Sequence, residues 1–158
     1  MEISSFPNPP AIPQDTKLAN RIFGANCGPV SFAALLNTLV LDVIRYFPHF
    51  PNYPHTSIPQ MKRAMDAFGV AYKSDDDWPQ HGLCLIQFNG IWTKHGRYSE
   101  ASKHRHWVAV SFGKIFDVNG YEWMGMEVWI SEIMPRLMAA HPGRSSWTLA
   151  KAYSVQHS

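Results

Sequence analysis

A cysteine at the start of an apolar stretch is the first residue whose type and position could do chemistry. Cys27 stands between Asn26 and the pair Gly28 and Pro29, and the residues from Val30 to Leu36 are mostly apolar. Because proline is tolerated in the first turn of a helix, the sequence predicts a helix that begins near the cysteine. The unpaired N–H groups and the dipole at a helix N-terminus favour thiolate, the nucleophilic form of cysteine. Cys27 is therefore a candidate nucleophile.

A base for this thiol is available on a predicted hairpin later in the chain. Residues 106–110 and 114–119 have the composition of two strands, and the turn between them falls at Phe112 and Gly113. A nucleophile on one element and a base on another are the two parts of nucleophilic catalysis, provided that a third group orients the base.

The register of this hairpin supplies the third group. A turn centred on Phe112 and Gly113 puts Val108 opposite Asp117, one diagonal step from His106. A carboxylate at that place can fix the tautomer of the imidazole and stabilise its protonated form. Asn119, opposite His106 in the same register, is the alternative orienting residue.

These motifs resemble those of the papain-like cysteine peptidase superfamily. The likeness lies in Asn26 to Pro29 at the start of a helix, a shorter helix that ends in glycine, His106 to Val110, and Ile115 to Asp117. Within the superfamily, the double-glycine leader peptidases of bacteriocin exporters and their stand-alone relatives are most similar, over roughly residues 20–120. The resemblance implies a papain-like α+β fold in which a long helix carries Cys27.

The resemblance also implies roles for the three residues. Cys27 attacks an amide carbonyl and forms a thioester, His106 acts as base and then as acid, and Asp117 orients His106. The family takes a further oxyanion donor from a glutamine shortly before the cysteine, but Arg21 stands at that place here. Asn20 is the nearest amide, with Gln14 and Asn26 as further candidates, beside the backbone N–H of Cys27.

The expected activity is therefore hydrolysis of a peptide or isopeptide bond in a peptide or protein substrate, without a cofactor. Deamidation and transfer to an amine use the same intermediate. Two other functions stay open. One is a peptidoglycan-cleaving amidase of similar architecture, and the other is a catalytically silent papain-like module that binds a peptide.

Other residues suggest weaker hypotheses. A zinc site from Cys27, His104 and His106 is not favoured, because neither Cys-x-x-Cys nor His-x-x-x-His spacing occurs, and we expect no metal. Cys84 lies inside an apolar run and is expected to be buried. The basic segment 94–105 is interpreted first as a solvated loop and second as a site for phosphates or an acidic substrate.

The remaining elements are predicted from apolar periodicity. One helix is expected to run from Cys27 past residue 40, since apolar residues recur at helical spacing: Phe32, Leu36, Leu39, Val40, Val43 and Phe47. Ser57 and Gln60 form a predicted capping box for a second helix, which ends at Gly69. Further expected elements are a brief strand at 70–73, a solvated turn at 74–77, a central strand at 83–88, a third helix at 130–140 and a strand at 147–155.

Helices followed by an antiparallel sheet predict the α+β class, with N-terminal helices packed on a C-terminal sheet. All of residues 1–158 are expected to form one domain, and the proline-rich residues 1–20 an extended N-terminal arm. The net charge of +2 is too small to indicate a nucleic-acid partner. No signal peptide or transmembrane segment is recognisable, so we expect a cytoplasmic protein without a membrane partner.

Overall fold

A six-stranded antiparallel sheet is the centre of the structure, a computed structural model that describes residues 11–23, 26–53, 55–96 and 98–156. The strand order is β1-β6-β2-β3-β4-β5. The strands are β1 (Ala71–Asp75), β2 (His81–Asn89), β3 (Arg105–Ser111), β4 (Lys114–Asp117), β5 (Glu122–Gly125) and β6 (Ser146–Gln156). The class is therefore mixed α+β, as predicted.

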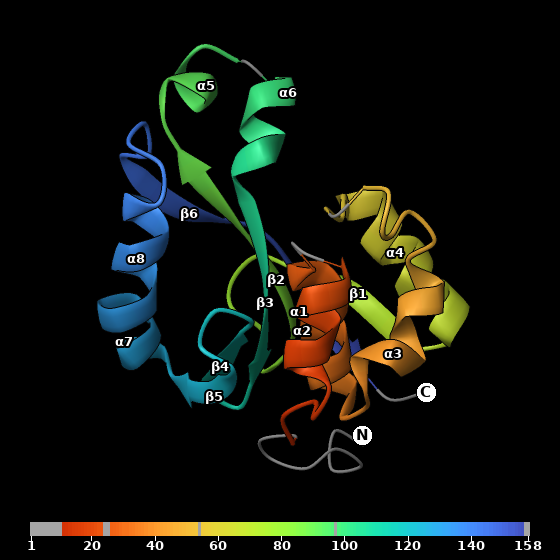
Figure 1. The fold of residues 1–158 in the computed structure, drawn as a ribbon. Helices are drawn as coiled ribbons and strands as arrows, with labels where there is room; N and C mark the ends of the chain where they lie inside the picture. The colour runs from red at the N-terminus through yellow and green to blue at the C-terminus, as the bar shows by residue number, and fades with distance from the viewer. Residues whose placement is uncertain (1–10, 24–25, 54, 97, 157–158) are drawn as a thin grey trace.

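Helices cover both faces of this sheet (Figure 1). One face carries α1 (Thr16–Phe23), α2 (Cys27–Leu36), α3 (Val40–Val43) with the 3-10 turn η2 (Ile44–Tyr46), and α4 (Ile58–Phe68). The other carries α7 (Met126–Val128), the π-helical turn η4 (Trp129–Ile133) and α8 (Met134–Ala139). Short helices α5 (Ile91–Lys94) and α6 (Tyr98–Ala101) and the turn η3 (Ser102–His104) join β2 to β3.

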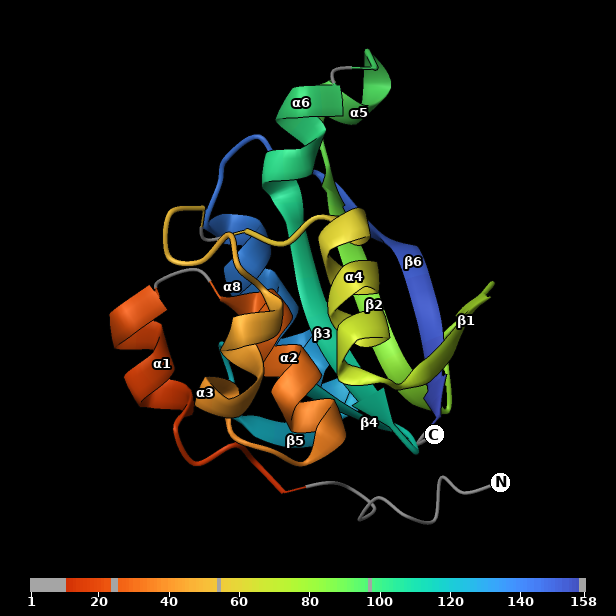
Figure 2. The ribbon, with the colours of Figure 1, turned by 90° about the vertical axis from the view of Figure 1, so that its right-hand side faces the viewer.

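Successive side chains of the central strand β2 pack alternately on the two faces of the sheet. Leu83 and Leu85 belong to the apolar cluster under α2 and α4, whereas Cys84 and Ile86 belong to the cluster under η4 and α8. Because successive side chains of a strand point to opposite faces, a strand covered on both sides reads as one continuous apolar run. Figure 2 shows the first of these faces, with α2 and α4 in front of the sheet.

The helix that begins at Cys27 is shorter than predicted. It ends at Leu36, because Asn37 adopts a left-handed conformation (φ 58°) and its N–H bonds back to the last turn. The chain then turns, and the axis of the following helical segment, Val40–Tyr46, is bent by 102° from that of α2. The apolar spacing continues across this break, which is why periodicity alone missed it.

The predicted extended arm is wrong for its last residues. Residues 1–10 lie outside the described residues, but α1 begins at Thr16, so residues 16–20 are helical rather than extended. Just before it, the carboxylate of Asp15 accepts hydrogen bonds from the N–H groups of Val40 (2.8 Å) and Leu41 (2.8 Å). This carboxylate satisfies free N–H groups at the start of α3 and fixes the N-terminal segment to the domain.

The second helix, α4, has the predicted ends. The N–H of Gln60 donates to Oγ of Ser57 (3.2 Å), and the N–H of Ser57 donates to Oε1 of Gln60 (2.7 Å). Gly69 closes the helix in the left-handed conformation (φ 94°), where a side chain would be strained.

Several boundaries differ from the prediction. The third helical stretch starts after Gly125, before the predicted residue 130, and β5 was not predicted. Ser74 and Asp75, predicted in a turn, belong to β1 and pair with β6. Among the described residues, no single helix is long and apolar enough to cross a membrane; Cys27–Leu36 and Val40–Tyr46 reach that length and hydropathy only as the bent pair.

Candidate active site

The hairpin β3–β4 brings His106 and Asp117 together. Its paired residues, Val110 with Ile115 and Ser111 with Lys114, have the predicted register around the turn at residues 112 and 113. Nε2 of His106 donates to Oδ2 of Asp117 at 2.9 Å. A carboxylate only accepts hydrogen bonds, so the proton of a neutral His106 lies on Nε2 and Nδ1 is left as the base.

Asp117 is held in place by further donors. Its Oδ1 accepts from the backbone N–H (2.8 Å) and side-chain amide (2.9 Å) of Asn119, and its Oδ2 also accepts from the indole of Trp129 (2.9 Å). Asn119 is thus a support of the carboxylate rather than its replacement. Trp129 comes from η4 on the opposite face of the sheet, a contact that no local sequence pattern indicates.

The buried pair is arranged as an imidazolium beside a carboxylate. Burial by itself lowers the pKa of His106, but the charge and hydrogen bond of Asp117, with a smaller contribution from Cys27, raise that pKa to about 10. Burial by itself raises the pKa of Asp117, but His106, Trp129 and Asn119 together lower it to about 2. Opposite charges in contact thus outweigh desolvation at both groups.

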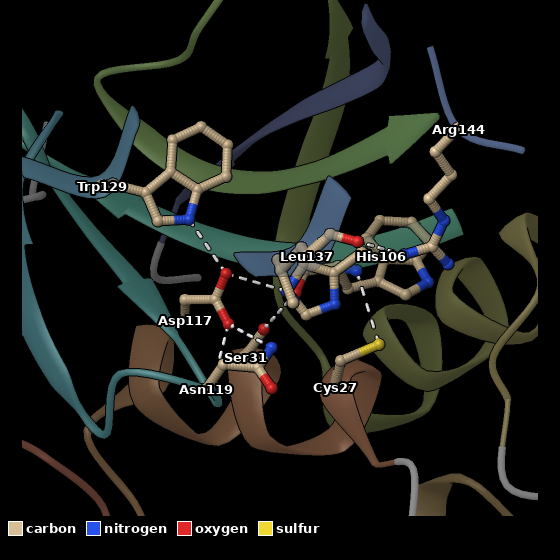
Figure 3. Close-up of polar contacts among 9 residues, drawn as sticks. Cys27, Ser31, His106, Asp117, Asn119, Trp129, Leu137 and Arg144 are labelled. Carbon is tan, nitrogen blue, oxygen red and sulfur yellow. Dashed lines mark hydrogen bonds and ion pairs between the residues drawn. The ribbon is translucent and has the colours of Figure 1, made fainter. Parts of the chain in front are cut away.

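Cys27 lies on the other side of the imidazole from Asp117. It is the first residue of α2, is partly exposed, and its sulfur accepts a hydrogen bond from the backbone N–H of Trp107 at 3.4 Å. Figure 3 shows the ring of His106 between the two groups, with the nitrogen that is not bound to Asp117 on the side of Cys27. The three predicted residues are therefore adjacent, in the order thiol, imidazole, carboxylate.

Contacts between α2, β3 and the loop before α4 fix this arrangement. The hydroxyl of Ser31, buried one turn after Cys27, donates to the carbonyl of Trp107 (3.1 Å). The indole of Trp107 donates to the carbonyl of Thr56 (2.8 Å). A Cβ on Gly28 would lie 2.5 Å from Oγ1 of Thr56, so only glycine lets this loop pack on the start of α2.

Two cavities open on either side of Cys27. One, of about 290 Å³, is lined by Tyr53, Ile58, Leu85 and Trp107 among others. The second, of about 440 Å³, is lined by His106, Asn119 and Arg144 among others. Cys27, His55, Lys103 and Arg105 line both cavities, so the sulfur faces a cleft that continues in two directions.

The predicted oxyanion residues differ in position. Asn20 lines the larger cavity beside Cys27, but its amide nitrogen donates to the hydroxyl of Tyr121 (2.6 Å). Gln14 is exposed and lines a separate hollow with Asn37 and Asp42. Asn26 is among the residues that line the larger cavity, and its side chain is buried, with no partner for its oxygen or nitrogen among the described residues. The side chain that would stabilise an oxyanion stays a prediction.

No protein-family model and no curated protein sequence matches this chain. Its function is therefore inferred from the chemistry of Cys27, His106 and Asp117.

The weaker hypotheses can be placed on the same structure. Cys84 is buried, as predicted, and burial raises the pKa of its thiol. Within the residues that the structure describes, no three His, Cys, Asp or Glu side chains are grouped to hold a metal ion. In the basic segment 94–105, the described residues include the end of α5, the helix α6 and the 3-10 turn η3, and Lys103 and Arg105 line both cavities.

Proposed function

We propose that this chain is a papain-like cysteine hydrolase that cleaves amide bonds in peptide or protein substrates. One observation supports this most strongly. The ring of His106 lies between Cys27 and the buried carboxylate of Asp117, and the partly exposed sulfur faces an open cleft. Nucleophile, base and orienting group then meet the geometric requirements of covalent catalysis together.

The proposed reaction begins from an ion pair, in which Nδ1 of His106 already carries the proton of the Cys27 thiol. The thiolate attacks the carbonyl carbon of the substrate, and the negative charge moves to the carbonyl oxygen. When the C–N bond breaks, the imidazolium of His106 gives its proton to the leaving amine, and the acyl group remains on Cys27 as a thioester. Water, deprotonated at Nδ1 of His106, then attacks the thioester, and the carboxylic acid product leaves with regeneration of the thiol.

Asp117 accepts no proton in this sequence. Its pKa of about 2 keeps it ionised, and its bond to Nε2 keeps Nδ1 directed toward Cys27. The negative charge of Asp117 stabilises the imidazolium of His106, and this imidazolium in turn stabilises the thiolate of Cys27.

The cleft favours an extended peptide over a small amide. Since cavities lie on both sides of Cys27, a substrate can place residues on either side of the scissile bond. The backbone N–H of Cys27 supplies one oxyanion donor in this proposal, and a nearby amide, Asn20 or Asn26, supplies the second. Deamidation or transfer to an amine differs only in which group leaves and which group attacks the thioester.

The direct test is to incubate the protein with a complex peptide mixture and, separately, with cell-wall fragments, and to identify new termini by mass spectrometry. We expect new peptide termini with the wild-type chain and none with Cys27→Ala. An acyl adduct on Cys27, trapped by acid quenching and released by hydroxylamine, identifies the thioester. Cleavage of cell-wall fragments alone would favour the amidase. Products that are the same for wild type and Cys27→Ala, or no products from either substrate, would refute the proposal.

A further inference from the structure

The larger cavity beside Cys27 and His106 contains a concentration of positive charge. Lys103, Arg105 and Arg144 all line it, and none of its lining residues is Asp or Glu. Asp117, the nearest acid in the site, is fully buried behind the ring of His106 and is already paired with it. An anion that enters this cavity would meet cations without a competing acidic wall.

Arg105 is held in this position by neutral groups. Its Nε donates to Oε1 of Gln87 (2.8 Å), a side chain that is itself buried in β2. The amide nitrogen of Gln87 in turn donates to the carbonyls of Ala101 (2.9 Å) and His104 (3.2 Å). Since Gln87 neutralises none of the charge of Arg105, the guanidinium is oriented yet remains a full cation.

Arg144 is fixed in a comparable way. Its Nη1 donates to the carbonyl of Leu137 (2.6 Å), its Nε donates to Nδ1 of His104 (3.3 Å), and its guanidinium lies over the ring of Phe88 (4.2 Å to the centroid). Each of these partners is uncharged when His104 is neutral, and burial is the main cause that lowers the pKa of His104. Among the described residues, Arg144 forms no ion pair with a carboxylate. Some N–H groups of Arg144 thus hold the guanidinium in position, but their partners do not neutralise its positive charge.

The buried amide of Asn26 is a second, independent sign of a ligand. It lines the same cavity with 1% of its surface exposed, and neither polar atom of its side chain has a partner among the described residues. Buried amides are ordinarily hydrogen-bonded, because a buried polar atom without a partner costs free energy. If this amide turns toward the cavity, a bound polar group there would remove this cost.

We propose that this cavity binds a carboxylate of the substrate next to the scissile amide bond, held by Arg105, Arg144 and Lys103 and completed by the amide of Asn26. A planar guanidinium pairs with both oxygens of a carboxylate, which makes arginine suited to this recognition. The proposal rests on the hydrolase function above and narrows its substrate class to acidic peptides. The carboxylate comes either from an Asp or Glu side chain or from the C-terminus of a peptide.

The charge of the cavity can be tested by alkylating Cys27 with two reagents that differ in charge, iodoacetate and iodoacetamide. We expect the ratio of their rate constants to fall by about tenfold in Arg105→Glu and in Lys103→Glu, because an anion near the sulfur is then repelled. Lys114→Glu is the matched control, since it changes the net charge equally from an exposed position on β4 outside both cavities. A ratio that falls no further in the cavity variants than in Lys114→Glu would overturn the proposal.

The ratio of the iodoacetate and iodoacetamide rate constants can be measured independently of whether the Cys27 thiol is activated by His106. At a pH of about 9, where an ordinary thiol is ionised, both reagents react with Cys27 even if the proposed hydrolase function is wrong. Slow reaction of Cys27 at acidic pH would therefore count against the hydrolase, whereas an unaltered ratio at pH about 9 would count against the anion cavity. Lys103 is exposed, so its variant stays informative if Arg105→Glu fails to fold.

Protection of Cys27 against iodoacetamide identifies the source of the carboxylate. The probes are N-acetylglutamate α-amide, with a side-chain carboxylate, N-acetylglutamine, with a terminal carboxylate, and the neutral N-acetylglutamine amide. Protection by the first or the second probe, and not by the third, supports the proposal and shows which carboxylate is bound. Equal protection by all three, or by none, contradicts it.

Discussion

Asp117 is the residue that links three parts of the fold at the site. It accepts hydrogen bonds from His106, Asn119 and Trp129, which come from β3, the turn after β4 and the helical layer behind the sheet. The pairing of His106 with Asp117 was predictable, because two turn residues set the register of the hairpin. The contribution of Trp129 was not, because nothing local links it to Asp117 in the sequence.

Replacement of Asp117 by Asn should remove the negative charge that stabilises the imidazolium of His106, with little change in side-chain shape. Without the carboxylate, the main cause that raises the pKa of His106 is lost while burial remains, so this pKa falls from about 10. We expect hydrolysis of a cleaved peptide to slow by at least about 100-fold, in the range for loss of a positioned acid–base group. The pKa is measured from the imidazole proton resonances as a function of pH.

Asn119→Ala is the graded control for this change. It removes one of the donors to Asp117 but leaves the backbone donor and the charge in place, so the pKa of His106 should fall less than in Asp117→Asn. An unchanged His106 titration in Asp117→Asn would show that the pair does not exist in solution.

At the scale of elements, the start of α2 depends on how closely the loop before α4 approaches it. A helix starting at Cys27 and a capped helix starting at Ile58 were both predictable from local signals, namely Pro29 and the capping box. The close contact between Gly28 and Thr56 was not, because it joins segments that no periodicity relates. The break at Asn37 was missed for a different reason, since apolar spacing continues through it.

Gly28→Ala tests this contact. The new Cβ would lie 2.5 Å from Oγ1 and 2.7 Å from Cβ of Thr56, so the loop must move. We expect a loss of about 1–3 kcal/mol in the free energy of unfolding, typical of overpacking, together with slower alkylation of Cys27. Unfolding in denaturant measures the first effect, and mass spectrometry of the alkylated protein measures the second.

Two further variants isolate the cause. Gly125→Ala should be nearly neutral, because Gly125 has an ordinary φ of −63° and the nearest atom to a new Cβ is 3.4 Å away. Adding Thr56→Gly to Gly28→Ala should restore part of the lost stability, a coupling that a double-mutant cycle measures. Equal costs for Gly28→Ala and Gly125→Ala would contradict the assigned contact.

At the scale of the whole molecule, one sheet separates two apolar layers and carries a site that draws on both. The α+β class and most strands followed from the order of apolar patterns. The cavities did not, because Lys103, Arg105 and Arg144 meet only after β2, β3 and the segment before β6 have paired. Arg144 is far from Lys103 and Arg105 in the sequence, so their meeting in one cavity cannot be predicted from it. For this reason the sequence favours a solvated loop for the basic segment.

Buried histidines predict how the stability of the whole protein depends on pH. The pKa of His106 is higher in the folded state, about 10 against 6.5, so its contribution is complete below pH 6.5 and is lost as the pH rises toward 10. Burial lowers the pKa of His81 to about 4, so its contribution is present above pH 6.5 and is lost as the pH falls toward 4. The free energy of unfolding should therefore fall on both sides of a maximum near pH 6.5. His106 causes the fall at higher pH, the alkaline limb, and His81 causes the fall at lower pH, the acidic limb.

Denaturant unfolding at a series of pH values checks this maximum. His106→Gln should flatten the alkaline limb, and His81→Gln should flatten the acidic limb. Substitution of the exposed His95 by Gln serves as the control and should leave both limbs in place. If His106→Gln left the alkaline limb as steep as in the wild type, the raised pKa of His106 would be wrong.

The most direct measurement of the central claim is the pH dependence of alkylation of Cys27 by iodoacetamide, in the wild type and in His106→Gln. We expect iodoacetamide at mildly acidic pH to label wild-type Cys27 stoichiometrically, whereas buried Cys84 does not react. In His106→Gln, labelling of Cys27 at the same pH should be slow, because no imidazolium is left to stabilise the thiolate. The same rate of Cys27 labelling in both proteins at mildly acidic pH would contradict the thiolate–imidazolium pair.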